Sequence, residues 1–422
     1  MRILPLSLAI LAAATATTGH AEDSSQAISS GSAFNPAISL ILSGGFYQDS
    51  ASGSLPAPAG MNNLAPGLQD QGFNLGETEL VLSATVDPNF DAAANIVLDG
   101  EGRAEVEEAW FETRQLPYGL KIRAGKMKSN IGYLNSQHPH TWDFADQNLA
   151  YNALLGGEGI ADAGLRVEWL PELPLYTLIG AEALQGKQEL VGVSQAELDP
   201  ASALMPPEEK KGPRLFTAYV KVSPEIGDNH TLQLGLWGLR AQQQQEARFD
   251  ASTTDEYVLD GDENLYGFEA VYKYDGGGEA GADNLKLQAE LLHGQKNLAV
   301  AALNGAPVYS NSNAVVPGDK VDSSESAWYL QAVYGIAPRW QAGLRVDQSG
   351  LGSKRKEAGV STDFDASSRI SAALTWNLTE FSRLRAQYSR ADVSDAAARE
   401  QKYDQYFLTY SMSLGTHGAH KF

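Results

Sequence analysis

The amino-acid sequence predicts an all-β fold, a transmembrane antiparallel β-barrel of about 16 strands. Apolar and polar residues alternate with a period of two in segments of about ten residues along the whole chain. The connections between these segments alternate between short and long. Strands with lipid on one face and water on the other need this alternation, and tight turns at one end with long loops at the other are typical of outer-membrane barrels.

The first residues have the pattern of a secretory signal peptide. Arg2 precedes an apolar run from Ile3 to Ala14, and small residues end this segment at Ala21. The apolar run is too short to cross a bilayer as a helix. Residues 22–36 are mostly small and polar, which predicts a flexible leader, and residues 37–422 form the predicted barrel. We therefore expect export to the outer membrane of a Gram-negative bacterium, insertion by the barrel assembly machinery, and contact with lipid and lipopolysaccharide.

The composition excludes several classes of function. The 422 residues carry a formal net charge of -21 and no cysteine. An acidic chain lacks the basic face that nucleic-acid binding needs, and stability without disulfides depends on burial and backbone pairing. The sequence contains no nucleophile elbow, no HExxH and no phosphate-binding glycine loop, so we predict that the protein is not an enzyme.

The predicted strands follow the alternating segments in order. A clear example is the segment in which Ile370, Ala372 and Leu374 alternate with polar neighbours. The predicted spans are 37–48, 73–86, 93–100, 103–115, 119–128, 160–170, 174–184, 213–223, 229–241, 263–274, 284–295, 325–336, 339–349, 367–378, 382–391 and 403–415. The short connections contain Pro, Gly and Asp, as tight turns do.

Aromatic residues favour a membrane barrel over a soluble sandwich. They lie near strand ends on the apolar face: Trp169, Tyr272, Tyr274, Tyr334, Trp340, Trp376 and Phe381. Tyr and Trp are enriched where a barrel meets the two membrane–water boundaries. In a soluble sandwich the same side chains would be core residues. The terminal Phe422 resembles the assembly signal of outer-membrane proteins, although the tail before it lacks apolar alternation.

One hairpin carries a resemblance to a known family. The segments 106–112 and 116–128, with Asn130-Ile131-Gly132 and His138-Pro139-His140, resemble the matching hairpin of phosphate-selective and related sixteen-stranded porins. The whole chain resembles proteins labelled zinc-regulated TonB-dependent outer membrane receptors. Such receptors have a plug domain, and here the first strand begins near residue 37, so we expect no plug. The resemblance implies a third external loop that folds into the barrel, and commonly a homotrimer.

Residues 129–159 are this third external loop. Alternation stops there for about thirty residues, and a structureless segment of that length is usually functional. Its aromatic and leucine residues favour burial inside the barrel, and a lid over the mouth is the alternative. We therefore predict a constriction formed by Trp142, Asp143, Phe144, Asp146 and Glu158.

Strand parity predicts a basic wall facing this loop. Its members are Lys121, Arg123, Arg345, Arg369, Arg383 and Arg385. Opposed to the acidic residues of the loop, these side chains would create a transverse field that makes anion passage possible. The alternative is a neutralised ladder in which inward acids pair with the arginines and leave no selectivity: Asp347, Glu290, Glu269 and Glu168.

The function predicted from these residues is passive diffusion of small hydrophilic solutes or ions through a porin-like channel. One alternative is an uptake protein for zinc or a metal complex, because His138 and His140 with Asp143 and Asp146 offer imidazole and carboxylate ligands. His417 and His420 have the same weak potential, and a periplasmic polar tail is the alternative. A second alternative is a non-conducting structural or adhesion barrel. We predict no cofactor, with zinc left open.

Overall fold

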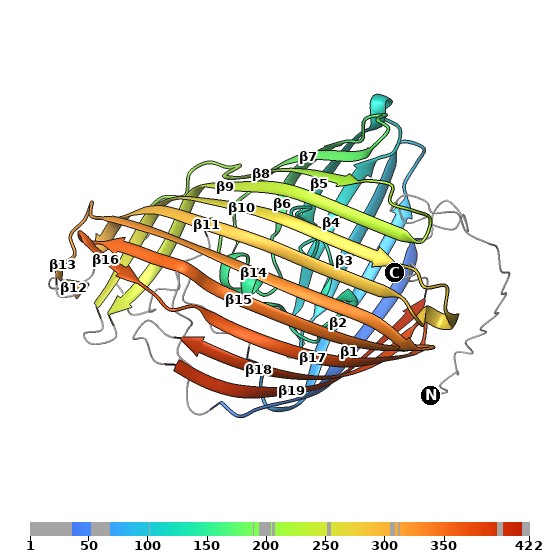
Figure 1. Ribbon diagram of the computed structural model, residues 1–422. Coiled ribbons are helices and arrows are strands. Elements are labelled where there is room, and N and C mark those ends of the chain that lie inside the picture. Colours follow the sequence, from blue (N-terminus) through green and yellow to red (C-terminus); the bar gives the residue numbers. More distant parts are fainter. Residues whose placement is uncertain are drawn as a thin grey trace, which may run out of the picture.

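The computed structural model describes residues 36–51, 68–100, 102–188, 190–193, 204, 207–250, 255–303, 309–310, 313–394 and 400–415. These residues form a closed antiparallel β-barrel of sixteen long strands (Figure 1). Each strand pairs with its neighbours along the chain, and β1 pairs with β19 to close the barrel, with Leu42 opposite Met412. The predicted fold class is confirmed. The predicted signal peptide, leader residues 22–35, Phe422, His417 and His420 lie outside the described residues.

The barrel strands are β1 (Ala37–Asp49), β2 (Gly72–Thr85), β3 (Phe90–Leu98), β4 (Ala104–Thr113), β5 (Leu120–Lys128), β6 (Ala161–Trp169), β7 (Tyr176–Leu184), β8 (Leu215–Ser223), β9 (His230–Asp250), β10 (Asp255–Tyr274), β11 (Leu285–Leu303), β14 (Lys320–Ala337), β15 (Trp340–Glu357), β17 (Ser367–Thr379), β18 (Ser382–Ser394) and β19 (Glu400–Gly415). Short additions are β12 (Tyr309–Ser310), β13 (Asn313–Ala314) and β16 (Val360–Asp363). The helices are η1 (Pro117–Gly119), η2 (Pro139–Thr141), α1 (Leu149–Leu154) and η3 (Glu279–Gly281). None of the helices in the described residues has the length and apolar character needed to cross a membrane.

Every predicted strand is present, but five of them are longer than predicted by five or more residues. β9, β10, β11, β14 and β15 have 18 to 21 residues each. They continue through much of the sequence that we expected to form long loops, and they project beyond the rest of the barrel (Figure 1). Their extensions pair in register, as between Lys296 and Glu263.

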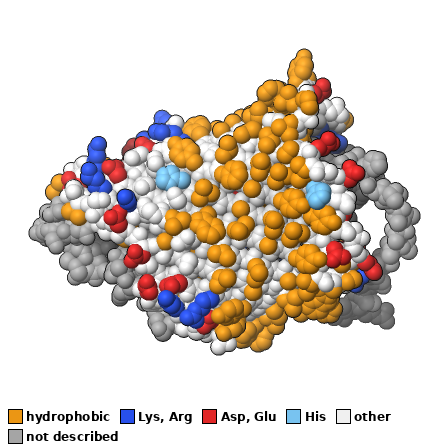
Figure 2. Space-filling model, viewed as in Figure 1, with side chains coloured by type: hydrophobic (Ala, Val, Ile, Leu, Met, Phe, Trp, Pro, Cys, Tyr) orange, Lys and Arg blue, Asp and Glu red, His pale blue; other side chains and the backbone are white. Residues whose placement is uncertain are grey.

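The two faces of each strand differ as the alternation predicts. On β17, Ile370 and Leu374 are 53% and 43% exposed on the outer face, whereas Arg369 and Ser371 are buried inside. On the face shown in Figure 2, apolar side chains form a broad band, and charged side chains gather beyond this band. A band of this kind is what the lipid bilayer requires.

Aromatic residues lie at the short-turn end of the band. Trp340 and Trp376 are opposite each other in the β15–β17 register and stack with ring centroids 5.4 Å apart. Both rings are partly exposed on the outer face, next to the short turns at residues 338–339 and 380–381. This position agrees with the predicted aromatic girdle.

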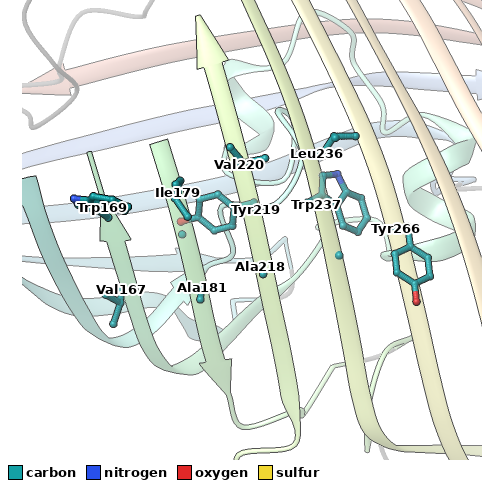
Figure 3. Close-up of a pocket in the computed structure, with 12 residues that line it drawn as sticks. Val167, Trp169, Ile179, Ala181, Ala218, Tyr219, Val220, Leu236, Trp237 and Tyr266 are labelled. Atoms are coloured by element: carbon teal, nitrogen blue, oxygen red, sulfur yellow. The ribbon is translucent and has the colours of Figure 1, made fainter. Parts of the chain in front are cut away.

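A shallow hollow of about 600 Å³ lies in the outer face over β6 to β10 (Figure 3). Small residues line it, among them Ala181, Ala218 and Gly238. Two glycines on the inner side of this wall accept neighbouring aromatic rings. The Tyr219 ring lies over Gly180, and the Trp237 ring lies over Gly267, so a Cβ at either glycine would overlap the ring.

The interior is filled unevenly. Residues 129–160, here called the inner loop, connect β5 to β6, and α1 lies within the barrel (Figure 1). Apolar residues of this loop form one buried cluster with inward residues of β7 to β14, including Ile131, Tyr151, Leu154, Trp237 and Tyr329. One side of the barrel interior is therefore packed like a protein core.

Candidate functional site

The inner loop is anchored at its start by carboxylates of the wall. The Asn130 backbone N–H donates to Glu182 Oε1 at 3.0 Å, and the Ser129 hydroxyl donates to the same carboxylate. The Asn130 side chain donates to Glu168 Oε1 at 2.8 Å. Glu182 is also paired with Arg166, at 2.7 Å. These bonds direct the chain inward as soon as β5 ends.

The helix α1 is held at its N-terminus by two side chains. Asn148 is its N-cap, and Asn148 Oδ1 accepts a hydrogen bond from the Tyr151 N–H at 2.9 Å. The Leu149 N–H donates to Asp347 Oδ2 of β15 at 2.7 Å. On the opposite side of the loop, the Tyr151 hydroxyl donates to Glu290 Oε2 of β11 at 2.9 Å. The helix is thus fixed between two strands of the wall.

Asp146 joins the loop to two arginines of the wall. Its two carboxylate oxygens lie 2.6 Å from Arg345 Nη2 and 2.6 Å from Arg369 Nη1. Gln387 donates to Asp146 Oδ1 at 2.7 Å. Burial opposes ionisation, but the charges of Arg345 and Arg369 hold the pKa of Asp146 below its usual 3.8. Asp347 completes this network at 2.7 Å from Arg369.

Asp143 makes a second contact of the same kind. Its Oδ2 lies 2.8 Å from Lys286 Nζ and accepts a hydrogen bond from Gln331 at 2.8 Å. Burial opposes ionisation here too, and the Lys286 charge lowers the pKa of Asp143. Asp143 and Asp146 are therefore paired directly with the wall instead of facing it across open space.

Arg383 and Arg385 bind the loop through its backbone. Arg385 donates to the Trp142 carbonyl at 2.6 Å, and Arg383 donates to the same carbonyl at 3.3 Å and to the His140 carbonyl. In the described part of the chain, neither guanidinium group has a carboxylate within ion-pair distance. Backbone carbonyls satisfy their hydrogen bonds without cancelling their charge.

The other two residues of the predicted basic wall, Lys121 and Arg123, pair with an acid of the wall itself. Arg123 Nη2 lies 2.8 Å from Glu112 Oε2, and Lys121 Nζ lies 3.7 Å from Glu112 Oε1. Both residues are thus paired with β4, and the Arg123 guanidinium also covers the Trp110 ring at 3.7 Å. This pairing within the wall agrees with the neutralised ladder that the sequence left as an alternative, because strand parity gives the direction of a side chain but not its partner.

A cavity of about 390 Å³ lies between the inner loop and β1, β2, β18 and β19. Trp142, Phe144 and Asp146 line it from the loop. The wall opposite contributes Ser43, Glu77, Glu79, Arg383, Arg385, Thr409 and Ser411. The inner loop therefore fills one side of the barrel and leaves space on the other.

The cavity has opposite charges on different strands. Arg383 and Arg385 are on β18, whereas Glu77 and Glu79 are on β2. The predicted Glu158 lies on the acidic side, where its carbonyl accepts a bond from Lys128 at 3.3 Å. Burial raises the pKa of Glu158, and the Lys128 charge opposes this shift. Glu158 therefore contributes to the acidic side and does not pair with the arginines.

The two histidines of the loop contact acidic residues that we did not predict. His138 Nδ1 lies 3.0 Å from Glu107 Oε2, and His138 Nε2 lies 2.9 Å from Glu108 Oε1. His140 Nδ1 lies 2.6 Å from Glu79 Oε1. Burial opposes protonation, but the hydrogen bonds and charges of Glu107 and Glu108 raise the pKa of His138 to about 10.

A β-bulge explains why adjacent residues reach the same histidine. Asn95 is opposite Glu108 and the next residue, Ile96, is opposite Val106, so Glu107 is the extra residue of β4. At a bulge two residues oppose one, which interrupts the alternation of side chains. The adjacent pair Glu107-Glu108 in an otherwise alternating strand was the signal in the sequence. The predicted partners of the histidines are bound elsewhere: Asp143 pairs with Lys286 of β11, and Asp146 pairs with Arg345 of the basic wall.

Comparisons with known proteins give one relative by sequence and several by fold. No known family model matches the chain. An "Uncharacterized protein" of Aquifex aeolicus (strain VF5) is 31% identical over 406 residues, which span 92% of this chain and 80% of the relative.

The similar solved structures are outer-membrane proteins. The outer membrane channel DcaP of Acinetobacter baumannii has a TM-score of 0.54 at 12% identity, covering 90% of this chain and 97% of that one. The trimer form of OmpT from Vibrio cholerae has a TM-score of 0.52 at 10% identity, and an anion-selective porin from Comamonas acidovorans has 0.50 at 11%. Each of these two covers 90% of this chain and 99% of its own. At these identities the likeness establishes the fold alone.

Proposed function

We propose a function from the premise that this chain belongs to the same family as the Aquifex aeolicus protein and has the fold of outer-membrane porins. The protein acts as a porin-like channel of the bacterial outer membrane, through which small hydrophilic solutes or ions diffuse passively. The observation that carries this proposal is the cavity of about 390 Å³ beside the inner loop. The inner loop narrows the lumen, and the cavity is part of the route that remains.

The charges along the cavity support selection among solutes. Arg383 and Arg385 stand on one side, and Glu77, Glu79 and Glu158 on the other. Such a separation creates a transverse field, which orients a dipolar solute and holds an anion against the arginines. Because Arg383 and Arg385 are bound to carbonyls, their charge is retained for the solute. The resemblance to phosphate-selective porins makes inorganic phosphate the first anion to test.

The ion-paired residues of the wall have a different role from Arg383 and Arg385. Asp146 and Asp347 neutralise Arg345 and Arg369, so the network fixes the loop and adds little net field. The wall therefore combines the two alternatives that the sequence left open. Two arginines act in a neutralised ladder, and two others supply the field. We also propose a homotrimer, in line with the trimer form of the Vibrio cholerae protein.

Planar-bilayer recording of the purified mature chain tests the channel directly. We expect stepwise current increments in KCl, each proportional to voltage, because an aqueous route of fixed shape conducts without gating energy. Heat-denatured protein in the same detergent is the control. If native protein inserts into the bilayer, as membrane flotation would show, and yet carries no current, the channel proposal is overturned and a structural or adhesion barrel takes its place.

A further inference from the structure

Three side chains that bind metals in other proteins meet between the inner loop and the wall. Glu79 of β2, Glu107 of β4 and His138 of the inner loop each direct one ligand atom to a common point, and these atoms lie within 4.8 Å of one another. His138 Nδ1 is 3.0 Å from Glu107 Oε2 and 3.8 Å from Glu79 Oε2. Glu79 and Glu107 are both buried, with 1% and 7% of their surface exposed.

The orientation of His138 is fixed by a fourth residue. Glu108 Oε1 lies 2.9 Å from His138 Nε2, on the side of the ring away from the other two carboxylates. Such a bond holds the ring with Nδ1 facing Glu79 and Glu107, so an ion that binds there would replace the proton that Nδ1 shares with Glu107. A carboxylate that orients the distal nitrogen of a histidine in this way is usual behind metal-ligating histidines.

A buried amide supplies an independent observation. Asn95 is 4% exposed, and its Nδ2 lies 3.0 Å from Glu79 Oε2, 3.0 Å from Glu107 Oε2 and 3.3 Å from His138 Nδ1. Its Oδ1 has no hydrogen-bond partner among the described residues. The two ends of an amide are interchanged by a half-turn. That turn would direct the unsatisfied oxygen at two carboxylates, which is favourable only if a cation lies between them.

We propose that Glu79, Glu107 and His138 bind a divalent transition-metal ion, with Asn95 Oδ1 as an additional oxygen ligand. One imidazole and two carboxylates suit borderline ions such as Zn²⁺, which accept nitrogen and oxygen ligands at about 2.0–2.2 Å. Mg²⁺ and Ca²⁺ take oxygen ligands, so the histidine disfavours them. The site is built from β2, β4 and the inner loop, and a bound ion would tie the loop to the wall.

The site adjoins the cavity, because Glu79 contributes to both. A bound ion would add positive charge to the acidic side of the cavity and reduce the transverse field. Binding itself does not depend on conduction. The proposal therefore goes beyond the channel function and is tested without measuring current, so the failure of one leaves the other standing.

Calorimetric titration of the detergent-solubilised mature chain with ZnCl₂ is the experiment. The protein carries no affinity tag, and both the reference and the variants contain His417→Ala and His420→Ala, which removes the other histidine pair of the tail. We expect one ion per chain. Glu107→Gln and His138→Ala should each weaken binding more than about tenfold, since loss of an orienting residue alone costs about 10–100-fold.

The matched control is Glu105→Gln. Glu105 lies two residues from Glu107 on β4, but it is exposed and paired with Lys126 at 3.0 Å. This variant should bind Zn²⁺ as the reference does, and the folding of each variant is checked by its mobility on unheated gels. Co²⁺ supplies a second readout, because the position and intensity of its visible d–d bands depend on its ligands and geometry and should change in His138→Ala.

The alternative is that His138 is only an ion-paired anchor of the loop. In that case the reference shows no saturable heat with ZnCl₂, or the same affinity remains in Glu107→Gln and His138→Ala. Either result overturns the metal site. If the protein bound Mg²⁺ as tightly as Zn²⁺, the proposal would also be overturned, because Mg²⁺ prefers oxygen ligands to a histidine nitrogen.

Discussion

We propose that selectivity depends on Arg383 and Arg385. Both line the cavity, and both donate to backbone carbonyls of the inner loop. Arg345 and Arg369 lie on neighbouring strands but are paired with Asp146. The four arginines all point into the barrel, but they differ in their partners. An arginine that is paired with a carboxylate fixes the loop, whereas one that is bound to backbone carbonyls keeps its net charge.

The first prediction concerns these two arginines. Arg383→Gln with Arg385→Gln should shift the reversal potential in a KCl gradient towards cations, because the acidic side of the cavity then dominates. A loss of about 1 kcal/mol of attraction for an anion corresponds to about a fivefold change in the permeability ratio. Arg390→Gln is the control, since Arg390 is on the same strand but faces outward and is paired with Asp404. An unchanged reversal potential in the double variant would contradict the assignment.

The second prediction concerns Asp146, which stabilises the loop as an anion. Its pKa in the folded protein lies below 3.8, so its stabilisation is complete above the unfolded pKa of about 4 and is lost as the pH falls through the lower folded value. Asp146→Asn should lower the free energy of unfolding at pH 7 by about 3 kcal/mol, because two buried guanidinium groups lose their counter-charge.

The difference between Asp146→Asn and the wild type should therefore shrink as the pH falls below the unfolded pKa of about 4 towards the lower pKa of the folded protein. Denaturant unfolding in detergent micelles between pH 7 and pH 2.5 measures this difference. A difference that stays constant over the whole range would show that the charge of Asp146 has no part in it.

At the scale of elements, the alternation predicted all sixteen strands but not their full length. Five strands continue past the apolar band, where lipid no longer demands an apolar face. The Gln242 to Gln245 stretch of β9 shows the reason, since four identical polar residues carry no period. A bulge between Gly261 and Glu263 of β10 shifts the β9–β10 register opposite this glutamine stretch. Periodicity therefore marks the part of a strand that meets lipid.

The inner loop was predictable as a buried segment, but its partners were not. Trp142, Phe144 and Leu154 are unusual in a loop facing water, and all three are buried. The partner acids Glu79, Glu107 and Glu108 come from strands far away in sequence, and one of them depends on a bulge. The alternation in a single sequence predicts on which face of the sheet a residue lies. It does not predict which other strands supply the partners of that residue in a site.

The third prediction concerns the glycines under aromatic rings. Gly267→Val should destabilise the barrel by about 1–3 kcal/mol, since a Cβ there would overlap the Trp237 indole on the neighbouring strand. Gly238→Ala is the matched control, because its nearest contact would be an ordinary one at 3.6 Å. The midpoint of heat unfolding, followed by gel mobility, measures both. Equal midpoints for the two variants would contradict this prediction and would mean that the Trp237 side chain moves to accommodate the new side chain.

At the scale of the whole molecule, the barrel interior is divided between a packed side and an open side. The inner loop joins β7 to β14 in one apolar cluster and leaves a cavity along β1, β2, β18 and β19. An ordinary barrel of this size has an aqueous lumen. The central claim is that solutes pass along the open side, between the inner loop and these four strands.

Modification of a single cysteine tests this claim most directly, because the natural chain has none. Ser411→Cys places a thiol on the cavity wall, and Ala327→Cys places one in the packed cluster. We predict that a bulky methanethiosulfonate reduces the single-channel conductance of Ser411→Cys and leaves Ala327→Cys and the wild type unchanged. Undiminished conductance through Ser411→Cys, after mass spectrometry has shown complete modification, would contradict the account.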